Sequence, residues 1–250
     1  MALILFRITN FQLYCLLLIL VTPIAVFEQP HRLIHILFNN AWLAFIAAIV
    51  PAILLALMFS HIIKKSTQPF PLILHEHLGK YPGFILGILY IGVFILTCSF
   101  NLRVFIEFMK TNVLPNTPIS IFIGVIIFLG FVAIKSGLNN IARIGEIFII
   151  TAVPLLFFIV LLALFSSFHI DRIYPVGYMD YKSFGLGVFV ATLILGKMMP
   201  ILTLAFFIPD KNKTLPLMTK VIFTYLIMMA LITFSIIVML GTFPVLNFVF

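Results

Sequence analysis

The sequence has few charged residues for its length. Asp, Glu, Lys and Arg make up 9% of the 250 residues, whereas 64% of the side chains are hydrophobic and the mean hydropathy is +1.29. A water-soluble domain carries roughly a quarter charged residues, so a soluble globule is excluded and most of the surface must face lipid. A membrane-spanning helix needs about 20 apolar residues, and about 30 with its loop. We therefore predict an all-α integral membrane protein with about seven transmembrane helices.

The sequence also lacks the clusters that other functions require. Its two cysteines, Cys15 and Cys98, both lie in apolar runs, where thiols are most often packing residues. The net charge of +8 is not gathered into a basic patch with stacking aromatics, so we expect no nucleic-acid partner. His75-Glu76-His77 has no third ligand at helical spacing, and no acid, base and nucleophile converge. We expect no metal, no cofactor and no enzyme.

Gaps between charged residues place the helices. They predict spans at about 10–28, 37–63, 83–109, 118–136, 144–168, 184–208 and 217–241, in one transmembrane domain covering residues 1–250. With the N-terminus inside, nine Lys and Arg fall on the inner side and five on the outer side, which favours a cytoplasmic N-terminus. Of the two longer connections, 64–82 predicts a short amphipathic helix at the membrane surface. We interpret 169–182 as an ordinary outer loop rather than a ligand-entry lid.

Prolines inside the spans are a pointer to a binding site. Pro23 lies late in span one, and Pro200 lies late in span six after Gly196. Proline removes a helix hydrogen bond and clashes with the preceding turn. Corresponding interruptions in two halves of a transporter mark a midplane site built from half-helix ends. The alternative stays open, because prolines are common in membrane helices and Pro51 and Pro154 lie in other spans.

Lys197 is the one formal charge well inside a predicted span. A lysine there costs several kcal/mol unless it is paired, hydrated or neutral, so it indicates a functional interior site. The alternative is that the break between Gly196 and Pro200 brings it near water.

Other polar and aromatic positions follow helical spacing. Arg103 with Glu107, and Arg143 with Glu146, are spaced to form structural ion pairs on one helix face. The stripe of Tyr90, Phe94 and Thr97 on span three is more typical of packing than of a pocket.

Three motifs carry a family resemblance. They are ITNFQL at 8–13, RVFIEF at 103–108 running into LPNTP at 114–118, and Gly137 followed by ARIGE at 142–146. In this order, with seven predicted helices, they resemble the B-subunit permeases of bacterial spore germinant receptors, the GerAB type. That family is similar to amino-acid permeases of the APC superfamily, which have a LeuT-like fold of ten helices in two inverted five-helix repeats with broken helices one and six.

The resemblance implies both a fold and a function. The chain would hold the first repeat and two helices of the second, and would thus be C-terminally short. It would recognise a small nutrient germinant, typically an amino acid, in the inner membrane of a spore, with A-type and C-type receptor subunits as partners. The alternative is a cation- or proton-coupled amino-acid transporter.

The resemblance also implies a pocket. Its lining would come from the span-one break, from span three and from the span-six break: Thr22, Pro23, Ile24, Tyr90, Phe94, Thr97, Gly196, Lys197 and Pro200. Helix ends at such breaks suit a carboxylate.

Overall fold

The computed structural model describes residues 8–65, 70–166, 169–174, 176–177, 179–204 and 210–242, and all regular structure within them is helical. The α-helices are α1 (Asn10–Leu37), α2 (Ala41–Ala47), α3 (Ile49–Lys65), α4 (Phe70–Leu78), α5 (Lys80–Asn112), α6 (Ile119–Ser136), α7 (Leu138–Ser166), α8 (Tyr181–Leu193), α9 (Ile201–Leu204) and α10 (Thr214–Leu240). Short 3₁₀ segments are η1 (Phe38–Asn40), η2 (Ile170–Ile173), η3 (Ile194–Met198) and η5 (Lys211–Lys213).

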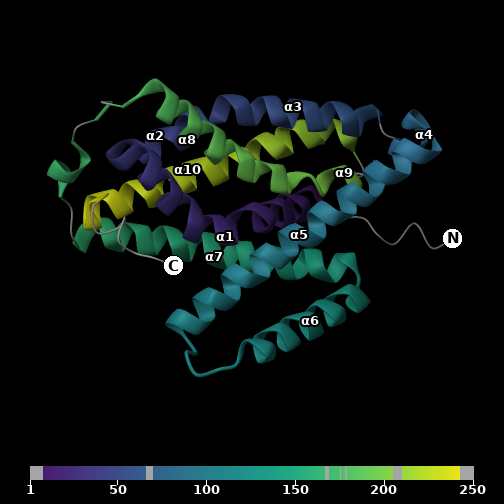
Figure 1. Cartoon of the computed structure of the whole chain (residues 1–250), viewed down its shortest axis with the longest axis horizontal. Helices are drawn as coiled ribbons and strands as arrows, with labels where there is room; N and C mark the ends of the chain where they lie inside the picture. Colours follow the sequence, from purple (N-terminus) through teal and green to yellow (C-terminus); the bar gives the residue numbers. More distant parts are fainter. Residues whose placement is uncertain are drawn as a thin grey trace.

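The helices account for seven membrane crossings. Six helical stretches of the described chain are long and apolar enough to span a membrane, and the first of them, Asn10–Lys65, has 56 residues. At about 1.5 Å per residue, a straight helix of that length would be roughly twice the thickness of a bilayer. The chain instead turns back at η1, where Phe38 has a positive φ of 50° (Figure 1). Because this turn divides the first stretch into α1 and α2–α3, each of which is long enough for one crossing, the predicted all-α membrane fold with about seven spans is confirmed.

α1 is longer than the sequence predicted, and it is not interrupted. It continues to Leu37 rather than ending at residue 28, and both Pro23 and Pro30 lie inside it. The predicted break at Pro23 is therefore wrong. The charges at Glu28 and Arg32, which we took as the end of the span, form an i,i+4 ion pair of 3.1 Å on the helix itself.

The sixth span is interrupted, as predicted. α8 ends at Leu193, the 3₁₀ turns of η3 follow, and α9 resumes only at Ile201. Gly196 and Pro200 both lie in this break. Glycine is among the poorest helix formers, and the proline ring clashes with the carbonyl four residues earlier, which here belongs to Gly196. The two residues together explain why the helix does not continue.

α10 lies at the centre of the bundle, with α1, α2–α3 and α7 packed against it (Figure 1). Two thirds (67%) of its most apolar window is buried, compared with 6% for α6. Tyr225 and Phe45 are fully buried between these central helices. α5 and α6 instead expose apolar side chains such as Ile95 and Ile134, in keeping with lipid contact.

The connection between α3 and α5 contains a helix, as the segment 64–82 predicted. α4 packs closely on the start of α5, and Gly83 makes this approach possible. A Cβ atom on Gly83 would lie 2.5 Å from the Cα of His75, which is too close for any side chain.

Candidate ligand site at the break of the sixth span

A cavity of about 440 Å³ lies where α1, α5 and the broken span meet. Its lining combines apolar and polar side chains from the three elements: Ile24, Glu28, Gln29 and Arg32 of α1; Leu96, Thr97, Phe100 and Asn101 of α5; and Val190, Leu193, Ile194 and Lys197 of α8 and η3. Ligand pockets in proteins typically measure about 300–1,000 Å³ and have mostly apolar walls with a few placed polar groups. The cavity has this character.

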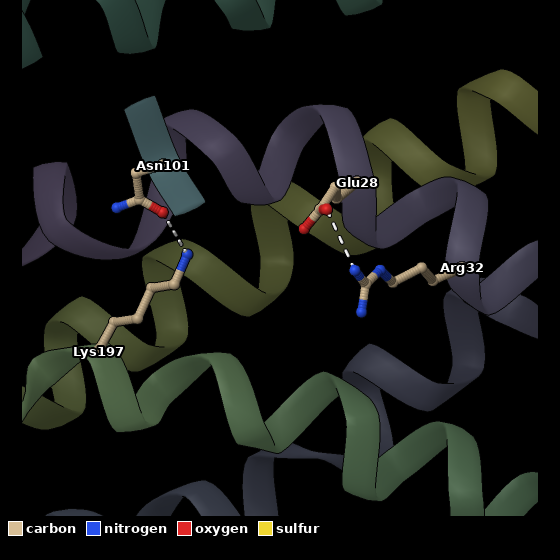
Figure 2. Close-up of polar contacts among 4 residues, drawn as sticks. All are labelled: Glu28, Arg32, Asn101 and Lys197. Atoms are coloured by element: carbon tan, nitrogen blue, oxygen red, sulfur yellow. Dashed lines mark hydrogen bonds and ion pairs between the residues drawn. The ribbon is translucent and has the colours of Figure 1, made fainter. Parts of the chain in front are cut away.

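Two polar pairs lie side by side in the cavity wall. Lys197 Nζ donates a hydrogen bond of 3.1 Å to Asn101 Oδ1, and Arg32 Nη2 donates one of 3.1 Å to Glu28 Oε1 (Figure 2). The first pair joins η3 to α5, whereas the second lies on α1. With Gln29, the wall holds two cations, one carboxylate and two amides, which is a net charge of +1.

The 3₁₀ geometry of η3 places Lys197 in the cavity rather than in lipid. The side chain is partly buried, and its ammonium group points towards Asn101 (Figure 2). Glu28 and Arg32 are more open, with 27% and 53% of their side chains exposed. A charge in a span is tolerated where it faces a polar cavity or a partner, so the expectation that Lys197 occupies an interior polar site agrees with this geometry.

Tyr90 of α5 contacts the C-terminal end of the break in span six. Its ring is 6% exposed, and its hydroxyl lies 2.8 Å from Thr203 Oγ1 and donates a longer bond of 3.5 Å to the carbonyl of Met199. Phe94 packs edge-on against the same ring, at 4.6 Å between centroids. These contacts tie α5 to the interrupted span.

The structure separates the predicted pocket residues into four groups. Ile24, Thr97 and Lys197 line the cavity, whereas Tyr90 and Phe94 brace the break, and Gly196 and Pro200 form it without lining the cavity. Pro23 is exposed on α1, and Thr22 has a buried hydroxyl with no hydrogen-bond partner in the described part of the chain. The structure does not bring Thr22 and Pro23 to the cavity.

Sequence reasoning missed the residues that complete the cavity. Glu28, Arg32 and Asn101 were not predicted as site residues, although their polar groups carry most of its chemistry. We read Glu28 and Arg32 as the boundary of span one, when their i,i+4 spacing was a signal that the helix continued. Asn101 was visible as a polar side chain five residues after Leu96, which ends a long apolar run of span three.

The predicted ion pairs differ in outcome. Arg103 Nε lies 2.8 Å from Glu107 Oε1 on the exposed face of α5. Glu146 instead accepts a hydrogen bond of 3.2 Å from Gln12 Nε2, and Arg143 forms no ion pair with it in the described structure.

The contact between Gln12 and Glu146 joins two of the sequence motifs noted above. Thr9 and Gln12 form a capping box at the start of α1, in which the Gln12 amide oxygen accepts the Thr9 N–H and the Thr9 hydroxyl accepts the Gln12 N–H. The remaining amide nitrogen of Gln12 reaches Glu146 on α7. Gly145 lies at the same helix contact, and a Cβ there would lie 3.0 Å from Cδ1 of Ile19.

These features together define a class of protein. A bundle of membrane-spanning helices with a partly charged cavity at an interrupted span has the layout of a permease. Within the described residues, no three His, Cys, Asp or Glu side chains lie close enough to hold a metal ion.

The comparison with known families agrees and is more specific. A family model described as "Spore germination protein", the spore permease family, matches residues 7–250, which is nearly the whole chain. The chain belongs to this family, which confirms the resemblance drawn from its motifs. The family consists of non-enzymatic membrane permeases.

Curated relatives point the same way. The chain is 34% identical to spore germination protein A2 of Bacillus subtilis (strain 168) over 103 residues, covering 41% of this chain and 28% of the relative. It is 31% identical to spore germination protein YndE over 128 residues, covering 49% and 35%, and 27% identical to spore germination protein B2 over 157 residues, covering 62% and 42%, both from the same strain. The chain therefore aligns with less than half of each relative's length. No solved structure matches it.

Proposed function

We propose that this spore germination protein is the B-type subunit of a germinant receptor and that the cavity at the break of span six recognises a small nutrient, most simply an amino acid. The observation that carries the proposal is that Lys197, Glu28 and Arg32 all line one cavity. A zwitterion is best bound where groups of both charge signs face it, and this cavity wall offers both.

The cavity chemistry suggests how such a ligand binds. Its carboxylate would interact with the ammonium of Lys197 and the guanidinium of Arg32, and its ammonium group with the carboxylate of Glu28. Charge-assisted hydrogen bonds are roughly twice as strong as neutral ones. The apolar part of the ligand would lie against Leu96 and Phe100.

The proposal includes a cellular setting. The receptor would lie in the inner membrane of the spore with its N-terminus in the cytoplasm, and A-type and C-type subunits would be its partners. Family membership and the Lys and Arg bias of the loops support this setting. The inverted five-helix repeat also stays a prediction.

Ligand binding to the purified chain tests the proposal. We expect saturable binding of at least one amino acid, and Lys197→Ala should weaken it by about tenfold to a hundredfold, the usual effect of losing a hydrogen bond to a charged group. Lys135→Ala is the matched control, since Lys135 is exposed on α6 and lies outside the cavity. Spores that carry the Lys197 variant should respond to the nutrient only at higher concentration. An unchanged dose response would remove Lys197 from the site.

A transporter is the second candidate. It is favoured by the position of Lys197 beside a carboxylate inside a span, an arrangement suited to coupling with a cation or proton. Labelled amino acid should be offered to proteoliposomes that contain this chain alone. Concentrative uptake would replace the receptor-only proposal with transport, and binding without uptake would support the receptor.

A further inference from the structure

A second cavity lies at the end of the bundle where α1 begins. It measures about 680 Å³ and is lined from α1 by Asn10 and Tyr14, and from η5 and α10 by Lys213, Lys220 and Thr224. It shares none of its lining residues with the cavity that contains Lys197. The proposed function therefore does not use it.

This basic cavity opens onto an apolar groove. The groove has a volume of about 300 Å³ and runs between α7 and α10, with Phe157 on one side and Ile227 and Leu231 on the other. Phe223 and Thr224 line both the basic cavity and the groove, so the two adjoin along α10.

One stripe of α10 connects the two regions. Lys220, Ile227 and Leu231 follow one another at intervals of seven and four residues, which keeps them on one face of α10, and Lys213 precedes them by seven residues in η5. The lysines occupy only the first part of the stripe. From Lys220 to Leu231 the helix rises about 16 Å, close to the hydrocarbon thickness of one bilayer leaflet of about 15 Å.

The stripe is not covered by the described chain. Phe223, Ile227 and Leu231 are 42%, 51% and 39% exposed, although they lie on the central helix. The Lys213 side chain is 62% exposed and is only 3.8 Å from Asp210, a weak pair, and Lys220 has no carboxylate within ion-pair distance in the described residues. The basic end therefore has unused positive charge.

We propose that this stripe binds an anionic phospholipid, with its phosphate between Lys213 and Lys220 and one acyl chain in the groove between α7 and α10. A phospholipid matches the order of the chemistry, because its anionic group and its chain are joined end to end at this spacing. Lysines near the membrane surface favour anionic lipids. The hydroxyls of Tyr14 and Thr224 bond to each other at 2.8 Å at the boundary between cavity and groove, so one of them is left to donate to a ligand.

Native mass spectrometry of the full chain in detergent tests this proposal, with phosphatidylglycerol and phosphatidylcholine of identical acyl chains as probes. We expect roughly tenfold to thirtyfold tighter retention of phosphatidylglycerol by the wild type. Lys213→Ala with Lys220→Ala should remove that preference. The matched control removes two exposed lysines elsewhere, Lys80→Ala with Lys135→Ala, and should keep it.

A second variant tests the acyl-chain groove. Leu231→Trp fills the groove and should lower the retention of both lipids severalfold, whereas Leu129→Trp, on the exposed face of α6, should not. Size-exclusion profiles and helix content establish that each variant is folded. Equal retention of the two lipids by the wild type, or a preference that survives loss of Lys213 and Lys220, would overturn the proposal. Equal competition by soluble glycerol phosphate would also overturn it, because the site would then bind phosphate without a chain.

Discussion

The hydrogen bond between Tyr90 and Thr203 is expected to stabilise the interrupted sixth span. It joins α5 to α9, the short helix that follows the break, and the two hydroxyl oxygens are 2.8 Å apart. Tyr90→Phe removes one hydroxyl and Thr203→Val the other, with little change in volume. Because Tyr90 is almost fully buried, water cannot readily replace the lost partner.

The magnitude follows from hydrogen bonds in similar settings. A side-chain hydrogen bond within a protein contributes about 0.5–1.5 kcal/mol net, and pairs between membrane helices average about 0.6 kcal/mol with a maximum near 1.7. Each substitution should therefore lower the free energy of unfolding by about 1 kcal/mol. For a chain of this length, that corresponds to a fall in Tm of about 2–4 °C.

A double-mutant cycle measures the pair directly. Unfolding is followed in detergent by the fluorescence of Trp42, the one tryptophan, which packs against Phe234 of α10 at 5.7 Å between centroids. The double variant should be more stable than the sum of the single effects predicts, by about 0.6 kcal/mol or more. Thr97→Val is the control, because its hydroxyl bonds to the Val93 carbonyl of its own helix. A coupling energy of zero between Tyr90 and Thr203 would refute the reasoning.

Two further substitutions test packing at other helix contacts. Gln12→Glu places a second carboxylate against Glu146 and should lower the free energy of unfolding by about 1 kcal/mol or more. Adding Glu146→Gln to that variant should restore most of the lost stability. Thermal unfolding measures both effects. Gly83→Ala pushes α4 away from α5 because its Cβ would meet the backbone of His75, so proteolysis within α4 should become faster; an unchanged cleavage rate would show that α4 stays packed on α5 despite the added methyl group, which contradicts this reasoning.

Much of the fold was predictable because charge marks the limits of apolar spans. The seven crossings and the helix between α3 and α5 follow from hydropathy and from the cost of an unpaired backbone in lipid. The end of α1 was mispredicted for a physical reason. Glu28 and Arg32 neutralise each other on one helix face beside a polar cavity, so they need not lie outside the membrane.

The site was only partly predictable, because a cavity depends on which helices become neighbours. Lys197 stood out alone as a charge within a span, but its partner Asn101 is 96 residues away, and nothing local connects the two. The spacing of Tyr90 and Phe94 indicated a packing stripe, and the two rings do pack against each other. Tyr90 also contacts the interrupted sixth span through its bond to Thr203. Spacing along the chain reveals which residues share a helix face, whereas contacts between helices need the fold.

The two prolines show why one residue type alone does not locate a break. Pro23 removes one hydrogen bond from α1, yet the residue four positions earlier is Ile19, the preceding turn contains no glycine, and Val21 and Ala25 on either side are buried in the bundle. Pro200 has Gly196 four positions earlier. Lys197, which follows Gly196, gains a hydrogen bond to Asn101 where the helix is interrupted. A proline interrupts a span where the preceding turn is also weak and a polar partner is available to the released segment. By this criterion, the sequence around each proline explains why span one is continuous and span six is broken. The cavity lies at the broken span.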